Sequence, residues 1–312
     1  MGPVVLGLTD GVLRMNRQTL AAAAVCSGIG LHSGERVRLV LKPAAPGTGI
    51  VFERTDLDGD NTRVEARATN VTTVRLGTTI ANEAGVSVAT VEHLMAALAA
   101  LGVDDVLVEI DGPEVPIVDG SSAPFVDLIA QVGLKASAAP RRAIRVLRSV
   151  SAEYQGRTAT FMPSLTPVID VEIDFPHPAV GRQRYAFDIS ADTFTGEVAS
   201  ARTFGFKRDV DALRAAGLAR GGSMDNAVVL DESGVLNEEG LRFADEFARH
   251  KALDALGDLA LAGAPILGRY QASQPGHALN NVAVRALLAD ESAWKMVTLS
   301  EALSSSAAVA RS

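Results

Sequence analysis

A histidine and an aspartate four residues apart have the spacing of two metal ligands on one helix. His250 and Asp254 fall within residues 240–262, whose apolar pattern predicts a helix, so both side chains share one face. The stripe on that face is apolar at both ends and runs through Phe243, Phe247, His250, Asp254, Asp258 and Leu261. An exposed His–Asp pair is the simpler explanation. The phenylalanines favour an inward face instead, where a carboxylate must be paired or bind a metal.

A Glu-His pair stands at the start of another predicted helix, which Thr90 can cap and Gly102 can end. Adjacent helical residues project about 100° apart, so a metal on His93 would leave Glu92 to one side, within reach of a metal-bound water. Zinc proteases place a glutamate beside a ligand histidine in the same way. A first-turn glutamate that balances the helix dipole is the alternative, and it is preferred unless a third ligand exists.

The two segments together supply three ligands, His93, His250 and Asp254, and leave a fourth position open. Three protein ligands with an open position are typical of catalytic zinc, whereas structural zinc sites close with four ligands that usually include cysteine. Cys26 is the only cysteine, so it cannot supply a closing pair. The pattern therefore predicts a catalytic zinc site, with Glu92 as the candidate base.

The other histidines of the chain have less specific surroundings. His277 follows a Pro-Gly turn, which makes it a candidate general acid and equally a surface histidine. His32 lies in the glycine-rich segment 28–34, which lacks the spacing and the following helix of a nucleotide-binding fingerprint. His177 stands between two prolines, and a structural role is preferred for it.

The elements that must position these side chains follow a repeated order. Strand patterns dominate the first part of the chain, and residues 36–42 alternate polar and apolar side chains as a half-buried strand does. Residues 135–140 are small residues closed by a proline and predict a linker. Beyond it, strands again come first and helices follow, which predicts an α+β fold of two similar domains. At 312 residues the chain is long enough for both.

Composition excludes several classes of protein. Hydrophobic residues make up 47% of the chain and charged residues 21%, as in ordinary globular enzymes. The formal net charge of −8 argues against nucleic-acid binding, which needs a basic surface. No run approaches the ~18 apolar residues of a membrane span, and residues 1–12 lack the basic start of a signal peptide. We expect a soluble, cytoplasmic monomer that neither binds nucleic acid nor inserts stably into a membrane.

Six segments of the chain resemble, in the same order, the UDP-3-O-acyl-N-acetylglucosamine deacetylases, which are zinc hydrolases of bacterial lipid A biosynthesis. The resemblance runs from about Gln18 to Thr298. It is carried by GIGLHSG at 28–34, TVEHL at 90–94, EVPIVDGSSAPF at 114–125, ARTFGF at 201–206, RHKALDALGD at 249–258 and GHALNN at 276–281. One such segment would be weak support, but six in order are specific.

The resemblance implies two α+β domains, each a small sheet layered with helices, with the active site between them. We place the domains at residues 18–138 and 139–303, with a disordered leader at 1–17 and a tail at 304–312. The implied reaction is hydrolysis of the N-acetyl group of UDP-3-O-acyl-N-acetylglucosamine, with release of acetate. It is an early committed step of lipid A biosynthesis, and Zn²⁺ is the implied cofactor.

The resemblance also assigns roles to residues around the metal. It places the zinc on the same two histidines and aspartate that the spacing indicated, and it makes Glu92 the general base. His277 falls at the general acid or oxyanion-stabilising position, and Asp258 at the carboxylate that orients this histidine. Thr203 matches a hydroxyl that supports the tetrahedral intermediate, and Lys251 matches a residue that helps to bind the anionic substrate.

Further positions of the family pattern concern the rest of the substrate. Phe175 and Phe206 match positions near the nucleotide and the sugar, Phe204 is a further substrate-binding candidate, and Arg157 is the candidate partner of the diphosphate. The hydrophobic passage for the acyl chain would be lined by Val210, Leu213, Ala219, Ser223 and Val229. Lys207 departs from the apolar residue of the family pattern, which bears on the preferred acyl chain.

Other functions are compatible with parts of this pattern. A zinc deacetylase of another N-acetyl sugar would use the same site without the acyl passage. A non-catalytic module that binds UDP-sugars or lipid precursors could share the scaffold, although binding alone has no use for a base such as Glu92. A structural or adaptor role has no sequence feature in its favour.

Overall fold

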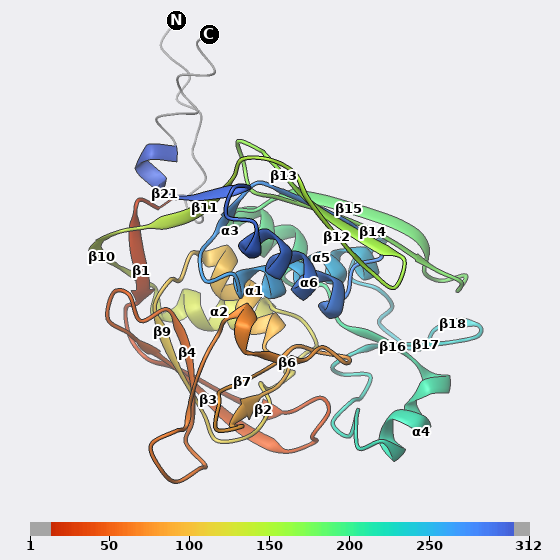
Figure 1. Cartoon of the computed structure of the whole chain (residues 1–312). Coiled ribbons are helices and arrows are strands. Elements are labelled where there is room, and N and C mark those ends of the chain that lie inside the picture. Colours follow the sequence, from red (N-terminus) through yellow and green to blue (C-terminus); the bar gives the residue numbers. More distant parts are fainter. Residues whose placement is uncertain (1–13, 303–312) are drawn as a thin grey trace, which may run out of the picture.

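Two five-stranded sheets with helices between them form most of the molecule, and this computed structural model describes residues 14–302 (Figure 1). The first sheet consists, in order across it, of β2 (Ala24–Ile29), β3 (Arg36–Pro43), β9 (Val106–Ile110), β4 (Ile50–Arg54) and β5 (Arg63–Glu65). The second consists of β12 (Val150–Tyr154), β13 (Arg157–Met162), β20 (Arg269–Ser273), β14 (Val168–Phe175) and β15 (Gly181–Asp188).

The two sheets have the same topology. In each, the last strand along the chain inserts between the second and the third, and it runs parallel only to the third. The parallel pairs are β4–β9 and β14–β20, and the other neighbours are antiparallel. The predicted α+β fold of two similarly built units is therefore confirmed. The exact boundaries placed between the units stay a prediction.

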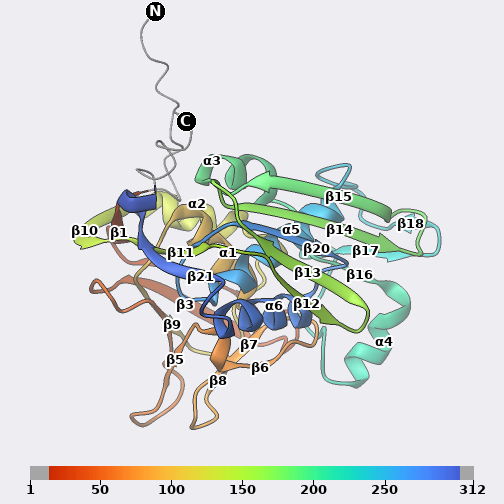
Figure 2. The same cartoon turned by 45° about the horizontal axis from the view of Figure 1, so that its top comes forward.

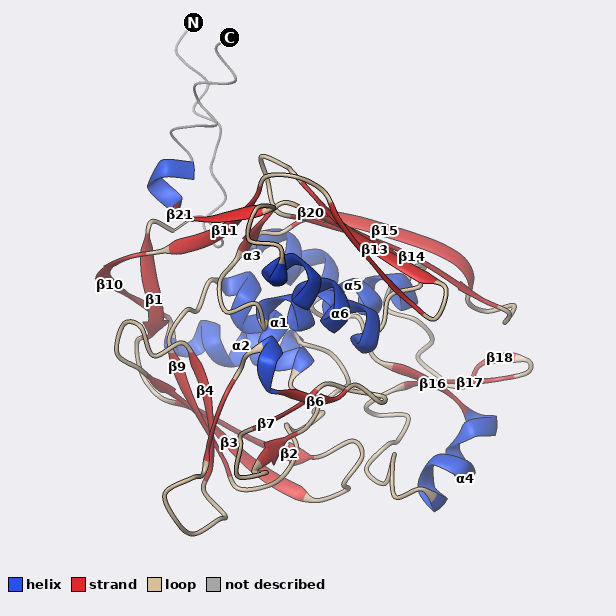
Figure 3. Cartoon of the chain, viewed as in Figure 1, coloured by secondary structure: helices blue, strands red, loops and turns tan. Residues whose placement is uncertain are grey.

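The helices between the sheets hold most of the core. They are α1 (Glu92–Leu101), α2 (Ala123–Val132), α5 (Glu246–Ala260) and α6 (His277–Ala289). Figure 3 shows these helices in blue between the red strands of the two sheets. Helix α5 contacts α1 from the first unit as well as α6 and the second sheet, so it joins the two halves.

Several short strands and helices surround this core. They are β1 (Asn16–Leu20) with β10 (Leu134–Pro140); β6 (Val71–Thr73), β7 (Thr79–Ala81) and β8 (Ser87–Val88); β16 (Phe204–Phe206), β17 (Val228–Asp231) and β18 (Gly234–Val235) with α4 (Lys207–Ala215); β19 (Ile266–Leu267), β11 (Arg142–Val146) and β21 (Trp294–Thr298); and α3 (Ala191–Thr193). Figure 2 shows α4 and β18 at one edge of the molecule and the β1–β10 pair at the other. Within residues 14–302, every helix falls short of the length and apolar content of a membrane span.

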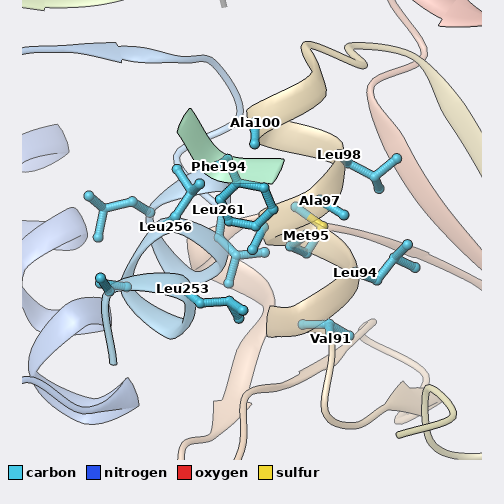
Figure 4. Packing of buried hydrophobic residues seen from close by; sticks show 14 of the residues in the cluster. Val91, Leu94, Met95, Ala97, Leu98, Ala100, Phe194, Leu253, Leu256 and Leu261 are labelled. Atoms are coloured by element: carbon cyan, nitrogen blue, oxygen red, sulfur yellow. The ribbon is translucent and has the colours of Figure 1, made fainter. Parts of the chain in front are cut away.

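Helix α1 follows directly from its sequence. Its ten residues are mostly alanine and leucine, which are strong helix formers, and it ends where Gly102 adopts a left-handed φ of 76°. Almost the whole helix is buried. Figure 4 shows Met95 on the side of α1 that faces Leu261 and Phe194, while Leu94 points away from them. A helix that is apolar over most of its surface must be covered on most sides, and here it packs against α5 and α2.

A glycine allows α5 to approach the start of α1. A Cβ atom at Gly257 would lie only 2.0 Å from the carbonyl oxygen of Glu92. No other residue has room at this contact unless the helices separate. The contact places the first turn of α1, with Glu92 and His93, against the part of α5 that carries Asp254 and Asp258.

Replacing Gly257 with alanine is expected to force the two helices apart. We expect the free energy of unfolding to fall by about 1–3 kcal/mol, the usual cost of overpacking a core. Urea denaturation measures this change. Gly196→Ala is the matched control, because a Cβ atom at Gly196 would meet no other atom within 4 Å. Equal stability of the two variants would show that the helix contact is not tight.

The predicted linker at residues 135–140 is wrong. These residues belong to β10, which pairs antiparallel with β1, near the beginning of the described chain. Small residues and a proline suggest a linker locally, but the pairing partner lies more than a hundred residues away and leaves no local signal. Two residues of the predicted leader, Asn16 and Arg17, also belong to β1. Residues 1–13 of that leader and the predicted tail at 304–312 lie outside the described residues.

Two predicted helix starts also need correction. Thr90 does not cap α1: the helix begins at Glu92, and the Thr90 hydroxyl donates instead to Oε1 of Glu114 at 2.8 Å. Helix α5 begins at Glu246 rather than at residue 240, and Phe243 therefore lies before it. The Glu246 carboxylate accepts a hydrogen bond from the backbone N–H of Arg242, which stabilises a non-helical turn ahead of the helix.

Candidate active site

The three predicted metal ligands converge between the two units. His93 comes from α1, while His250 and Asp254 lie one turn apart on α5. Their ligand atoms all lie within 4.8 Å of one another. Oδ1 of Asp254 is 3.5 Å from Nε2 of His93 and 3.4 Å from Nε2 of His250, and the two imidazole rings are perpendicular, at 89°. Two nitrogens and one oxygen thus face a common point, as three ligands of one ion do.

Neighbouring groups orient this trio. Nδ1 of His250 donates to the backbone carbonyl of Ala201 at 3.0 Å, which leaves Nε2 with its lone pair toward Asp254. Nζ of Lys251 donates to Oδ2 of Asp254 at 2.9 Å. Burial lowers the pKa of His250 to about 3, so this imidazole is neutral and can bind a cation. Burial alone would raise the pKa of Asp254, but His250 and Lys251 outweigh it and hold that pKa well below its usual value.

The trio fits a metal ion on a further observation. Oδ1 of Asp254 is fully buried, and among residues 14–302 it has no hydrogen-bond donor. A buried carboxylate oxygen without a partner is costly, and a cation between the two imidazoles would satisfy it. Two imidazoles and one carboxylate are a donor set that suits zinc. The residues present therefore fit Zn²⁺.

Glu92 lies beside the trio and has the features of a proton acceptor. Its side chain is buried, and burial raises its pKa. Oε2 accepts the backbone N–H of Thr78 at 2.9 Å, while Oε1 lies 3.7 Å from Nε2 of His277. A carboxylate with a raised pKa takes a proton more readily than an exposed one, which suits general-base catalysis at neutral pH.

His277, at the first position of α6, faces Glu92 across the site. Its Nδ1 donates to Oδ2 of Asp258 at 2.9 Å. The same oxygen accepts Nδ2 of Asn280 at 2.8 Å, and Asn280 in turn accepts the hydroxyl of Tyr270 at 2.7 Å. Burial lowers the pKa of His277, but the charges of Asp258 and Glu92 exceed this effect and raise it to about 10. The imidazole is therefore protonated at neutral pH and can donate a proton from Nε2.

A buried ligand trio with a proton acceptor on one side and a proton donor on the other is the arrangement of a metal-dependent hydrolase. A sequence model of the UDP-3-O-acyl N-acetylglycosamine deacetylase family matches residues 17–289. The chain belongs to this family. The match covers both five-stranded sheets and all the residues of the site.

Curated relatives in this deacetylase family are similar over almost their whole length. The UDP-3-O-acyl-N-acetylglucosamine deacetylase of Phenylobacterium zucineum (strain HLK1) is 48% identical, over 93% of this chain and 99% of its own. The enzyme of the same name from Vibrio parahaemolyticus is 46% identical, over 95% of this chain and 97% of its own. That of Pasteurella multocida (strain Pm70) is 46% identical, over 92% and 94%.

The site opens into a cavity of about 660 Å³. The predicted family residues Arg157, Phe175, Thr203, Phe204 and Lys251 all line it, together with the ligand trio, Glu92 and His277. Asp258 stands behind His277 rather than in the wall. Nζ of Lys251 lies 5.5 Å from the centre of the Phe204 ring, so a cation and an aromatic face meet the same space.

The predicted acyl-passage residues do not line this cavity. They lie after β16, in the part of the chain that carries α4, and they are Val210, Leu213, Ala219, Ser223 and Val229. Ser223 is exposed and the others are half-buried. Phe206, which was predicted near the nucleotide and the sugar, is also absent from the cavity wall. The ring of Phe206 contacts Phe175, with centroids 6.2 Å apart, and thereby joins this part of the chain to the cavity wall. The role of the five passage residues in holding an acyl chain stays a prediction of the family resemblance.

The glycine-rich segment 28–34 holds the part of the chain after α4 in place. The backbone N–H of Gly221 donates to the carbonyl of Leu31 at 3.0 Å, and that of Arg220 donates to His32. His177, in keeping with a structural role, makes hydrogen bonds to the backbone of Asp231 and Ala179.

Several residues of the site were not predicted from the sequence. Asn280 lies one turn after His277 on α6, so its helical spacing could have indicated it. Thr78 and Tyr270 reach the site only through long-range contacts, and their surroundings in sequence give no indication. The cavity wall also includes residues 72–76, at the end of β6 and after it, and the hairpin residues Tyr154 and Gln155.

Proposed function

We propose that this chain hydrolyses the N-acetyl group of UDP-3-O-acyl-N-acetylglucosamine and releases acetate, with zinc held by His93, His250 and Asp254. The carrying observation is that this trio, Glu92 and His277 meet in one cavity. Family membership supports the choice of substrate. The reaction would supply an early committed step of lipid A biosynthesis.

Each residue has a defined task in this proposal. When bound, zinc supplies Lewis-acid chemistry that polarises a carbonyl oxygen and makes water more acidic. Glu92 takes the proton of the attacking water at Oε1, the oxygen that the Thr78 amide leaves free. His277 then donates a proton from Nε2 to the departing amine nitrogen, or a hydrogen bond to the oxyanion. Thr203 offers a hydroxyl to the same oxyanion from the cavity wall.

The cavity offers groups for the rest of the substrate. Arg157 and Lys251 place two cations in its wall, which suits the charge of a diphosphate. Phe175 and Phe204 pack edge to face, with centroids 5.6 Å apart, and present apolar surface to the sugar. We assign the acyl chain to the predicted passage near α4, because Phe206 connects that part of the chain to the wall.

The proposal extends to the organisation of the chain. We assign residues 18–138 and 139–303 to its two domains, since α1 and α5 bring the catalytic groups from one unit each. We also propose that it acts as a monomer, because one chain supplies every ligand and both proton-transfer groups. A nucleotide-sugar substrate favours action in the cytoplasm.

Acetate release from UDP-3-O-acyl-N-acetylglucosamine tests the proposal. Chelator-stripped protein should be inactive, and one equivalent of zinc should restore turnover. Release of no acetate by folded, zinc-loaded protein would contradict the proposal and leave the binding-module alternative. Equal turnover of non-acylated UDP-N-acetylglucosamine would instead indicate a deacetylase of another sugar.

Replacing Asp258 with asparagine is expected to shift the alkaline limb of the pH–rate profile to lower pH. Activity needs His277 protonated, so it is lost as the pH rises through the raised pKa of His277, about 10 in the parent. Removing the adjacent negative charge should lower that pKa by about 1–3 units. Asp290→Asn is the control, because Asp290 pairs with Arg148 away from the cavity. An unmoved alkaline limb would exclude His277 as the titrating acid.

A further inference from the structure

One buried threonine contacts both proton-transfer groups of the site. The backbone N–H of Thr78 donates to Oε2 of Glu92 at 2.9 Å, and its hydroxyl donates to Oδ1 of Asp258 at 2.6 Å. Thr78 is 1% exposed. Glu92 lies on α1 and Asp258 on α5, so the two bonds of this single residue span the two helices.

The backbone around Thr78 is fixed against α1. Its carbonyl accepts the N–H of Val91, just before α1, at 3.2 Å. Gly77 precedes it, and a Cβ atom there would lie 3.2 Å from Oε1 of Glu92, so a small residue keeps the chain close to the carboxylate. Thr79, which follows, begins strand β7. With its N–H bound to Glu92 of α1 and its carbonyl bound to Val91 just before that helix, Thr78 directs its hydroxyl toward α5.

The hydroxyl bond fixes the rotation of the Asp258 carboxylate. Oδ1 accepts Thr78, while Oδ2 accepts Nδ1 of His277 and Nδ2 of Asn280. All three partners are donors, so both oxygens of the Asp258 carboxylate act as acceptors. Without the Thr78 bond, the carboxylate could turn about its Cβ–Cγ bond, and Oδ2 would no longer meet both partners at once.

We propose that Thr78 is a positioning residue that aligns the proton acceptor with the proton donor. Its amide holds Glu92 with Oε1 toward the site, and its hydroxyl holds Asp258 so that His277 stays protonated and aimed at the same space. The inference rests on the proposed roles of Glu92 and His277. The charged groups facing His277 are Glu92 from α1, and Asp254 and Asp258 from α5.

Thr78→Val tests the inference, since it removes the hydroxyl, keeps the shape and leaves the amide bond to Glu92 intact. For the zinc-loaded protein we expect kcat to fall about 10- to 100-fold, with KM and zinc content unchanged. Thr78→Ser should restore turnover, because it keeps the donor. Thr79→Val is the matched control, as Thr79 is the next residue and is absent from the described cavity wall. If Thr78→Val does not fold, Thr78→Ala makes the same deletion.

A second measurement follows the His277 ring directly. The chain has five histidines, so their ring signals can be assigned by NMR and titrated in the zinc-loaded protein. We expect a lower pKa of His277 in Thr78→Val, with parental values in Thr78→Ser and Thr79→Val. Parental kcat and an unchanged His277 titration in Thr78→Val would overturn the inference.

The two proposals fail in different ways. If the parent releases no acetate, the proposed function fails, while the His277 titration still decides whether Thr78 holds Asp258. If the parent is active and Glu92→Gln is not, but Thr78→Val turns over normally, only the positioning role is refuted.

Discussion

Replacing Glu92 with glutamine is expected to lower kcat about 10²- to 10⁴-fold, the usual contribution of a general base. The amide has the size of the carboxylate, and its oxygen can still accept the Thr78 N–H, so the surrounding structure should persist. It cannot take a proton from water. Burial raises the pKa of Glu92, which makes the parent carboxylate a competent base and the loss correspondingly large. Acetate release under substrate saturation measures the effect.

The controls for this variant separate catalysis from binding. Zinc content and KM should stay near those of the parent, because Glu92 is outside the ligand trio. Glu83→Gln, at an exposed position, should turn over normally. Near-normal turnover of Glu92→Gln would exclude Glu92 as the proton acceptor.

Replacing His250 with alanine is expected to abolish both metal binding and turnover. The variant keeps only two of the three ligands, which are too few to hold zinc tightly at neutral pH. Loss of a group that only orients a ligand costs about 10- to 100-fold, so loss of the ligand itself should cost more than about 10²-fold in activity. Metal content measured by mass spectrometry should fall well below one zinc per chain.

A second histidine variant makes this result specific. His32→Ala changes a histidine that is outside the trio, and it should keep full zinc content. His250→Gln retains most of the side-chain volume, which distinguishes loss of the ligand from a packing defect in the buried α5. Full zinc stoichiometry in folded His250→Ala would refute the ligand role.

The metal site was predictable because its information is local. The i,i+4 spacing of His250 and Asp254 fixes their shared face wherever the helix lies, and the structure brings His93 to the same point. The helix end at Gly102 was predictable for the same reason, since a left-handed φ favours glycine. The repeated order of strands and helices likewise predicted two similar α+β units, and the matching sheet topologies confirm them.

The errors arose where distant partners outweigh local preference. Residues 135–140 read as a linker, yet pairing with β1 makes them a strand. Threonine is a residue type that often caps helices. The Thr90 hydroxyl, however, donates to the Glu114 carboxylate, and Thr90 adopts a φ of 55° just before the helix. In both cases hydrogen bonds to a distant segment decided the local structure against the preference of the sequence pattern.

By itself, the sequence determined which residues could bind zinc, which helices carry them and which family the chain resembles. Tertiary structure alone decided how those helices meet. The close approach at Gly257 and the two bonds of Thr78 join segments far apart along the chain. Helical periodicity repeats every few residues and is therefore visible in a sequence. A contact between distant segments depends on the packing of the whole core, and no short pattern encodes it.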